Sequence, residues 1–284
     1  MRWLVTGASG MLGQDLVETL VASGADVTAS DRHNLDVLDA DAVHALLPGH
    51  DVVVNCAAWT AVDDAETHEA AAFQLNAVAP SLLAHAARRN GARFVQLSTD
   101  YVFDGSATSP YAEDGPVAPR SAYGRTKAAG EWAALAASPD SLVVRTAWLY
   151  GRHGSCFPRT IARLAAERGA LDVVADQVGQ PTWTRDVARV VVDLVAAQAP
   201  GGMYHATSDG TASWHEFAQA VVASAGLDPA LVSPVTSEKF VRPAPRPAYS
   251  VLGHGRLAAV GVAPVPDWAE RWAAASAEVL AAAP

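Results

Sequence analysis

The hydrophobic positions in the first half of the chain alternate between short apolar runs and longer amphipathic segments. Apolar runs of strand length lie at residues 2–7, 25–31, 51–58, 92–100 and 141–151. Helical patterns fill the intervals at residues 10–24, 40–49, 69–91 and 121–137, the third of them jogged near Pro80. Strands that alternate with helices specify a parallel sheet covered on both faces. We therefore predict an α/β fold with a Rossmann-type doubly wound parallel sheet, and ligands at the carboxyl ends of its strands.

Beyond Gly151 the pattern loosens, because glycine and proline become more frequent. The segments 179–195, 201–226 and 241–252 look like helices joined by longer loops. We expect a smaller, mostly helical C-terminal lobe that covers the mouth of the sheet. The predicted division is an NAD(P)-binding Rossmann domain over 1–150 and a substrate-binding lobe over 151–284, with 181–207 packing back on the first domain.

Composition narrows the class of protein further. Of the 284 residues, 50% are hydrophobic and 18% are charged, as in a soluble globular protein. The net charge of -10 argues against nucleic acid as a partner. The N-terminus turns into a glycine loop too early for a signal peptide, and no apolar run is long enough to cross a membrane. With two distant cysteines and no disulfide framework, a cytoplasmic location is expected.

The stretch "VTGASGMLG" places Gly7, Gly10 and Gly13 three apart, between a predicted strand and a predicted helix. In that context glycines allow a tight turn, a close approach of pyrophosphate and close packing of helix on strand. The helix N-terminus favours the negative charge of the phosphates. We predict a dinucleotide site there, which includes Met11 and Leu12 at the start of the helix.

Asp31 and Arg32 stand side by side at the end of the second predicted strand. An acid at this position accepts the ribose hydroxyls of NAD, whereas an arginine accommodates the 2′-phosphate of NADP. We expect NADP(H) with Arg32 as the phosphate contact, and NAD(H) remains the alternative.

Tyr123 and Lys127, in "SAYGRTKAAGE", lie four residues apart in a predicted helix and so share one face. A free tyrosine, with a pKa near ~10, is a poor proton donor at neutral pH. A cation about 4 Å away is worth about 4 kcal/mol at an effective dielectric of ~20. We therefore expect Lys127 to lower the pKa of Tyr123, so that the phenol can protonate a carbonyl oxygen as hydride reaches its carbon.

The motifs as a set resemble one known family. The glycine loop and the "YGRTK" helix, with "VNCAAWTAVDDAE", "STDYVFDG", "RTAWLYG", "DQVGQPTWTRDVA" and "RPAYSVL", are similar to the extended short-chain dehydrogenase/reductase superfamily. Within it the chain looks most like the dTDP-4-dehydrorhamnose reductase family. The resemblance covers essentially the whole chain.

The resemblance implies a role for each matching residue. The catalytic triad of the family falls on Thr99, Tyr123 and Lys127, with Thr99 steadying the substrate carbonyl and Lys127 bonded to the nicotinamide ribose. The cofactor positions are matched by Asp36, beside the adenine, and by Ala57 and Ala58. The positions that shape the sugar pocket are matched by Val62, Asp63, Asp100, Tyr101, Trp148 and Arg246.

The activity implied is NADPH-dependent reduction of the 4-keto group of a dTDP-4-keto-6-deoxyhexose, most simply of dTDP-4-dehydro-L-rhamnose to dTDP-L-rhamnose. Two alternatives stay open: a related deoxysugar reductase of an antibiotic pathway, such as a dTDP-dihydrostreptose synthase, and a non-catalytic NADP-binding regulatory subunit. Neighbouring nucleotide-sugar dehydratases carry a glutamate where this chain has Tyr101. This difference favours simple reduction.

Metal binding and assembly are the last expectations. Some members of the family dimerise through a magnesium site built from glutamates, but the matching positions here are Asp15 and Arg185. The nine histidines also show no metal-binding spacing, so we expect no metal. The expected partner is the dTDP-sugar substrate, and the expected state is a monomer or a homodimer.

Overall fold

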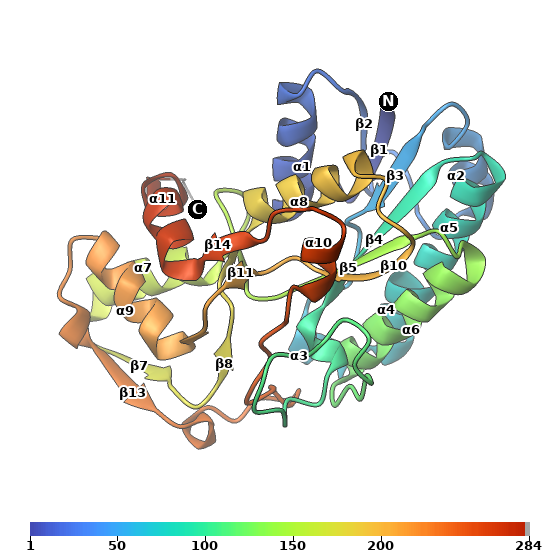
Figure 1. The fold of residues 1–284 in the computed structure, drawn as a ribbon. Coiled ribbons are helices and arrows are strands. Elements are labelled where there is room, and N and C mark those ends of the chain that lie inside the picture. The colour runs from blue at the N-terminus through green and yellow to red at the C-terminus, as the bar shows by residue number, and fades with distance from the viewer. Residues whose placement is uncertain (282–284) are drawn as a thin grey trace.

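The structure is a computed structural model that describes residues 1–281. At its centre lies one six-stranded sheet in the order β10-β5-β4-β3-β1-β2, with every pair of neighbours parallel (Figure 1). Its strands are β1 (Arg2–Thr6), β2 (Asp26–Ser30), β3 (Val52–Asn55), β4 (Arg93–Thr99), β5 (Leu142–Thr146) and β10 (Gly202–His205). The strand order reverses between β1 and β3. Ligands of such sheets bind in the crevice at the carboxyl ends, at this reversal.

Helices cover both faces of the sheet, as predicted. One face carries α1 (Met11–Ala22) and α8 (Thr184–Ala196), and the other carries α2 (Ala40–Leu46), α5 (Ala79–Arg89) and α6 (Ala122–Ala137) (Figure 1). Side chains of a strand point alternately to the two faces. In β1, Trp3 and Val5 therefore enter the core beneath α1 and α8, while Leu4 enters the opposite core. The predicted doubly wound α/β fold is confirmed.

The long helix predicted over 69–91 is continuous, but its irregularity differs from the prediction. Helix α4 (Glu69–Phe73) leads through a wide π-helical turn, η1 (Gln74–Val78), into α5. The N–H of Ala79 bonds to the carbonyl of Gln74, five residues back. Pro80 lacks the N–H that would bond four residues back, and the widened turn immediately precedes it. The jog expected near Pro80 is thus a π-helical turn that ends two residues before this proline.

The C-terminal half combines helices with short strand pairs. Its helices are α7 (Phe157–Arg168), α9 (Trp214–Ser224), α10 (Gly255–Ala259) and α11 (Trp268–Ala281). Its strand pairs are β6 (Leu149–Tyr150) with β9 (Thr182–Trp183), β7 (Leu171–Val174) with β13 (Val232–Val235), β8 (Val178–Gly179) with β12 (Ala212–Ser213), and β11 (Ser208–Asp209) with β14 (Val265–Asp267). Tyr150, Phe217 and Trp272 pack in its core.

The segment 241–252 is not helical, which corrects one expectation. It meets the rest of the chain through single bridges, Val178 with Tyr249 and Tyr111 with Leu252. Its three prolines, at 243, 245 and 247, remove backbone donors at every second position, which excludes a helix.

The chain returns to the sheet after entering the second half. Helix α8 packs in the same core as α1, and β10 extends the sheet beside β5. The division into 1–150 and 151–284 stays a prediction. No helix within residues 1–281 has the length and apolar character needed to cross a membrane.

Candidate active site

A cavity of about 870 Å³ lies at the carboxyl ends of the sheet strands. Its lining includes all residues predicted for catalysis and for the cofactor: Gly7, Gly10, Met11, Leu12, Gly13, Asp31, Arg32, Asp36, Ala57, Ala58, Thr99, Tyr123 and Lys127. Val62, Asp100, Tyr101 and Trp148 also line it, whereas Asp63 and Arg246 do not. The fold thus gathers residues between Thr6 and Leu149 into one cleft.

The glycine loop forms one wall of the cavity through close backbone packing. Gly7 has a φ of 66°, and a Cβ there would lie 2.5 Å from the Ala57 nitrogen. A Cβ at Gly13 would lie 2.3 Å from the Gly7 carbonyl oxygen. Helix α1 begins after Gly10 with no side-chain cap and no acidic residue in its first turn. Its free N–H groups and positive dipole end therefore suit a phosphate group.

The end of the cavity beside β2 holds the residues that were predicted to contact the adenosine. Arg32 is exposed, and within residues 1–281 its side chain makes no hydrogen bond or ion pair. The Asp31 carboxylate accepts from the backbone N–H of His33 at 2.9 Å, and that of Asp36 accepts from Leu38 at 2.9 Å. Both acids thus stabilise their own loops, while the Arg32 guanidinium stays available for an anion.

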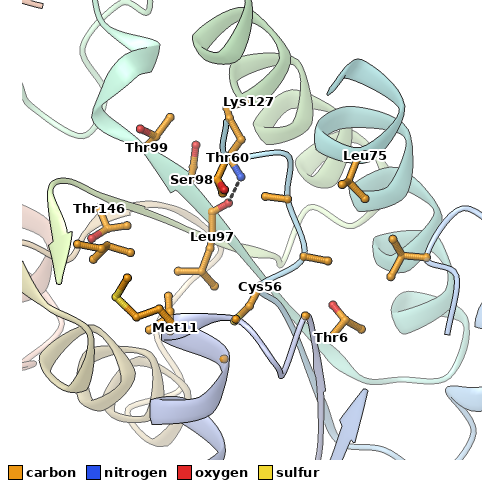
Figure 2. Close-up of a pocket in the computed structure, with 18 of the residues that line it drawn as sticks. Thr6, Met11, Cys56, Thr60, Leu75, Leu97, Ser98, Thr99, Lys127 and Thr146 are labelled. Carbon is orange, nitrogen blue, oxygen red and sulfur yellow. Dashed lines mark hydrogen bonds between the residues drawn. The ribbon is translucent and has the colours of Figure 1, made fainter. Parts of the chain in front are cut away.

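Helix α6 positions the tyrosine and the lysine. The hydroxyl of Ser121 caps its N-terminus by accepting from the Gly124 N–H at 3.1 Å. Tyr123 and Lys127 follow on one face, and both side chains reach the cavity. The Lys127 Nζ donates to the carbonyl oxygen of Leu97, in β4, at 2.7 Å (Figure 2).

The protonation of the pair differs from the sequence-based expectation. Burial raises the pKa of Tyr123 to about 12, and the neighbouring Thr99 hydroxyl offsets this only in part. Burial lowers the pKa of Lys127 to about 8. The expected lowering of the tyrosine pKa by the lysine was wrong for this structure, because desolvation of the phenolate dominates. The phenol therefore stays protonated at neutral pH, as a proton donor requires.

Strand β4 ends in polar groups that face the cavity. The Thr99 hydroxyl donates to Asp100 Oδ1 at 3.0 Å and accepts from the Tyr101 N–H at 3.2 Å. Burial raises the pKa of Asp100 to about 6. The Ser98 hydroxyl donates instead to buried Glu131 at 2.6 Å. Of the two hydroxyls, Thr99 is thus the one placed beside Tyr123.

Aromatic rings line the end of the cavity that lies beside β4 and β5. The Tyr101 ring meets the Tyr123 ring edge to face, with centroids 5.6 Å apart. The Trp148 ring stacks on Trp214, with centroids 3.5 Å apart and planes within 6°. A Cβ at Gly179 would lie 2.5 Å from the Trp148 ring. Trp148 is therefore fixed by contacts from the C-terminal half.

Asp63 and Arg246, two of the predicted sugar residues, are paired with each other. The Arg246 guanidinium contacts the Asp63 carboxylate at 2.9 Å, and the Ala244 N–H donates to the same carboxylate at 3.2 Å. Arg246 and Tyr101 also line a second, small hollow. The pair thus joins the short helix α3 (Val62–Ala65) to the segment 241–252 near Tyr101.

Asp15 lies in a charge cluster away from this cavity. Ligand atoms of Asp15, Glu18 and His153 lie within 4.8 Å of one another. Two guanidinium groups reach the same carboxylates, since Arg152 contacts Glu18 at 2.5 Å and Arg185 contacts Asp15 at 3.8 Å. These two guanidinium groups neutralise much of the negative charge that would be needed to bind a metal ion. Sequence spacing could not place His153 there, because it lies far along the chain from Asp15.

Several lining residues escaped the sequence reasoning. They lie at or near the carboxyl ends of the sheet strands: Thr6, Ser30, Cys56, Leu97, Thr146 and Ala147. Their signal was available, because every carboxyl end of a parallel strand reaches the same edge of the sheet. Leu75, from the π-helical turn, carried no such signal.

Comparisons with known proteins agree with this geometry. The family model described as "RmlD substrate binding domain" matches residues 1–281. The probable dTDP-4,6-dihydroxy-2-methyloxan-3-one 4-ketoreductase of Streptomyces antibioticus is 54% identical, over 99% of this chain and 97% of the relative. The dTDP-4-dehydrorhamnose reductase of Streptomyces griseus is 50% identical, over 94% and 90%. The crystal structure of dTDP-4-dehydrorhamnose reductase from Bacillus anthracis in complex with NADP matches with a TM-score of 0.93 and 35% identity, over 98% and 99%.

Proposed function

The chain belongs to the dTDP-4-dehydrorhamnose reductase family of extended short-chain dehydrogenases/reductases, and from that premise we propose that it is an NADPH-dependent reductase of a dTDP-4-keto-6-deoxyhexose. The simplest substrate is dTDP-4-dehydro-L-rhamnose, which gives dTDP-L-rhamnose. One observation supports the proposal most directly: Thr99, Tyr123 and Lys127 line the same cavity as the glycine loop.

The residues present fit a dinucleotide phosphate. The close packing around Gly7 and Gly13 brings the uncapped N-terminus of α1 to the cavity wall, where its N–H groups can hold pyrophosphate. The exposed Arg32 would hold a 2′-phosphate, the group that distinguishes NADP from NAD. The relative from Bacillus anthracis is crystallised with NADP. When bound, NADPH supplies the hydride.

The residues of the chain handle the proton and the orientation. The Tyr123 phenol donates its proton to the C4 carbonyl oxygen, which takes up the electron pair of the carbon–oxygen π bond, and solvent then reprotonates the tyrosine. The Thr99 hydroxyl orients that oxygen, and the Lys127 ammonium binds the nicotinamide ribose and stabilises the transient phenolate. Because the Tyr123 pKa is about 12, the phenol holds its proton until the reaction creates a strong acceptor.

The substrate end accounts for the remaining residues. We place Val62, Asp100, Tyr101 and Trp148 around the sugar, because they line the same cavity as the catalytic triad. Asp63 and Arg246 form an ion pair, and Arg246 lines a small hollow together with Tyr101, so we place Arg246 at the nucleotide-sugar as well. A cytoplasmic location and a monomeric or homodimeric state complete the proposal.

A coupled assay tests the proposal. The protein is incubated with dTDP-glucose, a 4,6-dehydratase, a 3,5-epimerase and NADPH, and NADPH absorbance is followed. We expect consumption that requires both upstream enzymes, with dTDP-L-rhamnose identified by NMR. Consumption without the epimerase would indicate a related deoxysugar, and no consumption in either mixture would exclude the reductase activity proposed.

A further inference from the structure

A chain of buried hydrogen bonds crosses the sheet directly beneath the cavity. The Thr6 hydroxyl donates to Asn55 Oδ1 at 2.7 Å, and Asn55 Nδ2 donates to Gln96 Oε1 at 2.9 Å. Gln96 Nε2 then donates to the Leu97 carbonyl oxygen at 2.7 Å. The chain connects the ends of β1, β3 and β4, and all four residues are buried.

The direction of this chain follows from one backbone group. The N–H of Ala57 donates to Asn55 at 3.1 Å, and a backbone N–H can only donate. The Asn55 atom that receives it is therefore the oxygen, which turns the amide nitrogen toward Gln96. Gln96 must accept there, so its own nitrogen faces Leu97. The orientations of both amides are thus fixed by the network.

The Leu97 carbonyl needs these partners because β3 ends beside it. The Arg93 N–H bonds to β3 at the Asp51 carbonyl, and alternate residues of a strand face the same neighbour, so Leu97 also faces β3. The next ladder donor would be the Ala57 N–H, which is bonded to Asn55 instead. Leu97 therefore presents a buried carbonyl without a ladder partner.

Two side chains supply the hydrogen-bond donors that the ladder lacks at Leu97. Gln96 donates one N–H, and the Lys127 ammonium donates another at 2.7 Å (Figure 2). A carbonyl oxygen has two lone pairs and can accept both. The ammonium has three N–H groups, and within residues 1–281 the Leu97 oxygen is its only hydrogen-bond acceptor. The other two remain for groups in the cavity that Lys127 lines.

We propose that Gln96 is a positioning residue for Lys127: by holding the Leu97 carbonyl, it lets the ammonium turn toward the nicotinamide ribose. The inference rests on the reductase function proposed above. Without Gln96, any movement of Lys127 leaves a buried carbonyl with no partner, which is costly. Lys127 would then be held in its present position on Leu97, and its two remaining N–H groups could not turn toward the ribose. Gln96 itself touches neither cofactor nor substrate.

The test compares two ligands of different length. NADPH carries the nicotinamide ribose, whereas 2′,5′-ADP carries only the adenosine phosphates. In Gln96→Met the donor is lost at similar side-chain volume, and we expect the Kd of NADPH to rise about 10-fold while that of 2′,5′-ADP stays within about 2-fold. Calorimetry gives both constants without turnover, so a failure here is separate from a failure to reduce the sugar.

A second comparison isolates the lysine. In Lys127→Met the ammonium is absent, so adding Gln96→Met is expected to cause no further loss of NADPH affinity. Gln180→Met is the matched control, because Gln180 is equally buried and bonds to Leu252 and Thr207 away from the cavity. It should lose stability while both Kd values stay unchanged.

The outcomes decide the role of Gln96. Equal losses for NADPH and 2′,5′-ADP would mean that Gln96 only supports the fold of the glycine loop, and no loss for either would also overturn the proposal. If Gln96→Met does not fold, Gln96→Leu replaces it, since leucine also lacks a donor for Leu97 and adds no charge beside Lys127. The same selective loss of NADPH affinity is expected, and an unchanged ratio of the two Kd values overturns the proposal.

Discussion

The two ends of the cavity are built by different means. At the cofactor end the walls are main chain: the glycine loop, the ends of parallel strands and a buried amide network hold them in place. At the substrate end the walls are side chains from distant segments, such as Trp148 stacked on Trp214. Main-chain walls tolerate little change, since an added Cβ at Gly7 or Gly13 would overlap backbone atoms. A side-chain wall can change shape while the fold stays intact.

Trp148 illustrates the second construction. Its backbone is left-handed, with a φ of 46°, a conformation that costs a bulky residue about 1 kcal/mol or more. The stack on Trp214 and the contact with Gly179 offset that cost. Trp214 covers one ring face and Gly179 packs closely against the ring around Cε2, so a ligand can meet only the part of the ring that these two contacts leave free. The substrate end therefore depends on a strained residue that the C-terminal half holds in place.

The largest effect is expected where the two ends meet, at Tyr123. Tyr123→Phe removes the proton donor and leaves the ring, so kcat should fall about 10²- to 10⁴-fold while the Kd of NADPH changes little. Steady-state kinetics and calorimetry measure the two quantities. Near-full activity would show that another group supplies the proton.

A substitution at Arg32 tests whether the cofactor end uses charge to select NADPH over NADH. Charge-assisted hydrogen bonds contribute about 1.5–3 kcal/mol, so Arg32→Ala should lower the preference for NADPH over NADH in kcat/KM about 10- to 100-fold. Arg89→Ala, an exposed arginine of α5, is the control. An unchanged preference would leave Arg32 as a merely solvated side chain.

The pH dependence separates the lysine from the tyrosine. The pKa of Lys127 is lowered to about 8 and that of Tyr123 is raised to about 12, so the lysine loses its proton first as the pH rises. Because kcat/KM for NADPH reports on the free enzyme, it should be flat between about pH 7, above the pKa of about 6 of Asp100, and about pH 8, and fall about 10-fold per pH unit above that. Lys127→Arg keeps a charge at all these pH values and should move the fall upward. A fall that stays near pH 8 in that variant would belong to another group.

The residues of the cofactor end could be predicted from the sequence because their positions follow from local rules. The alternation of strands and helices fixes a parallel sheet, and a parallel sheet brings all its carboxyl ends to one edge. Gly7, Gly10, Gly13, Tyr123 and Lys127 needed only their place in that pattern. What the pattern could not give was the protonation of Tyr123, because desolvation depends on how closely the site is packed.

The substrate end was less predictable because its contacts join segments far apart in the sequence. Trp148 was expected to face the sugar, but nothing in the sequence indicated Trp214 as its partner. Asp63 and Arg246 were each expected at the sugar, and their ion pair depends on the path of the proline-rich segment 241–252. The same holds for the bond between Gln96 and Leu97, which exists because β3 ends at Asn55.

The smallest effect expected is at Trp214, and it tests whether the substrate end is separable from the cofactor end. An aromatic pair contributes about 0.5–1.5 kcal/mol beyond burial, so in Trp214→Ala the KM for the keto-sugar should rise about 2- to 10-fold. The Kd of NADPH should not change, because Trp214 does not line the cavity. Trp214→Phe retains a ring for Trp148 and should restore much of the loss. Trp132→Ala, at a tryptophan that is 59% exposed, is the matched control. A parallel loss of NADPH affinity in Trp214→Ala would contradict the separation, since it would mean that the stack also holds the main-chain walls.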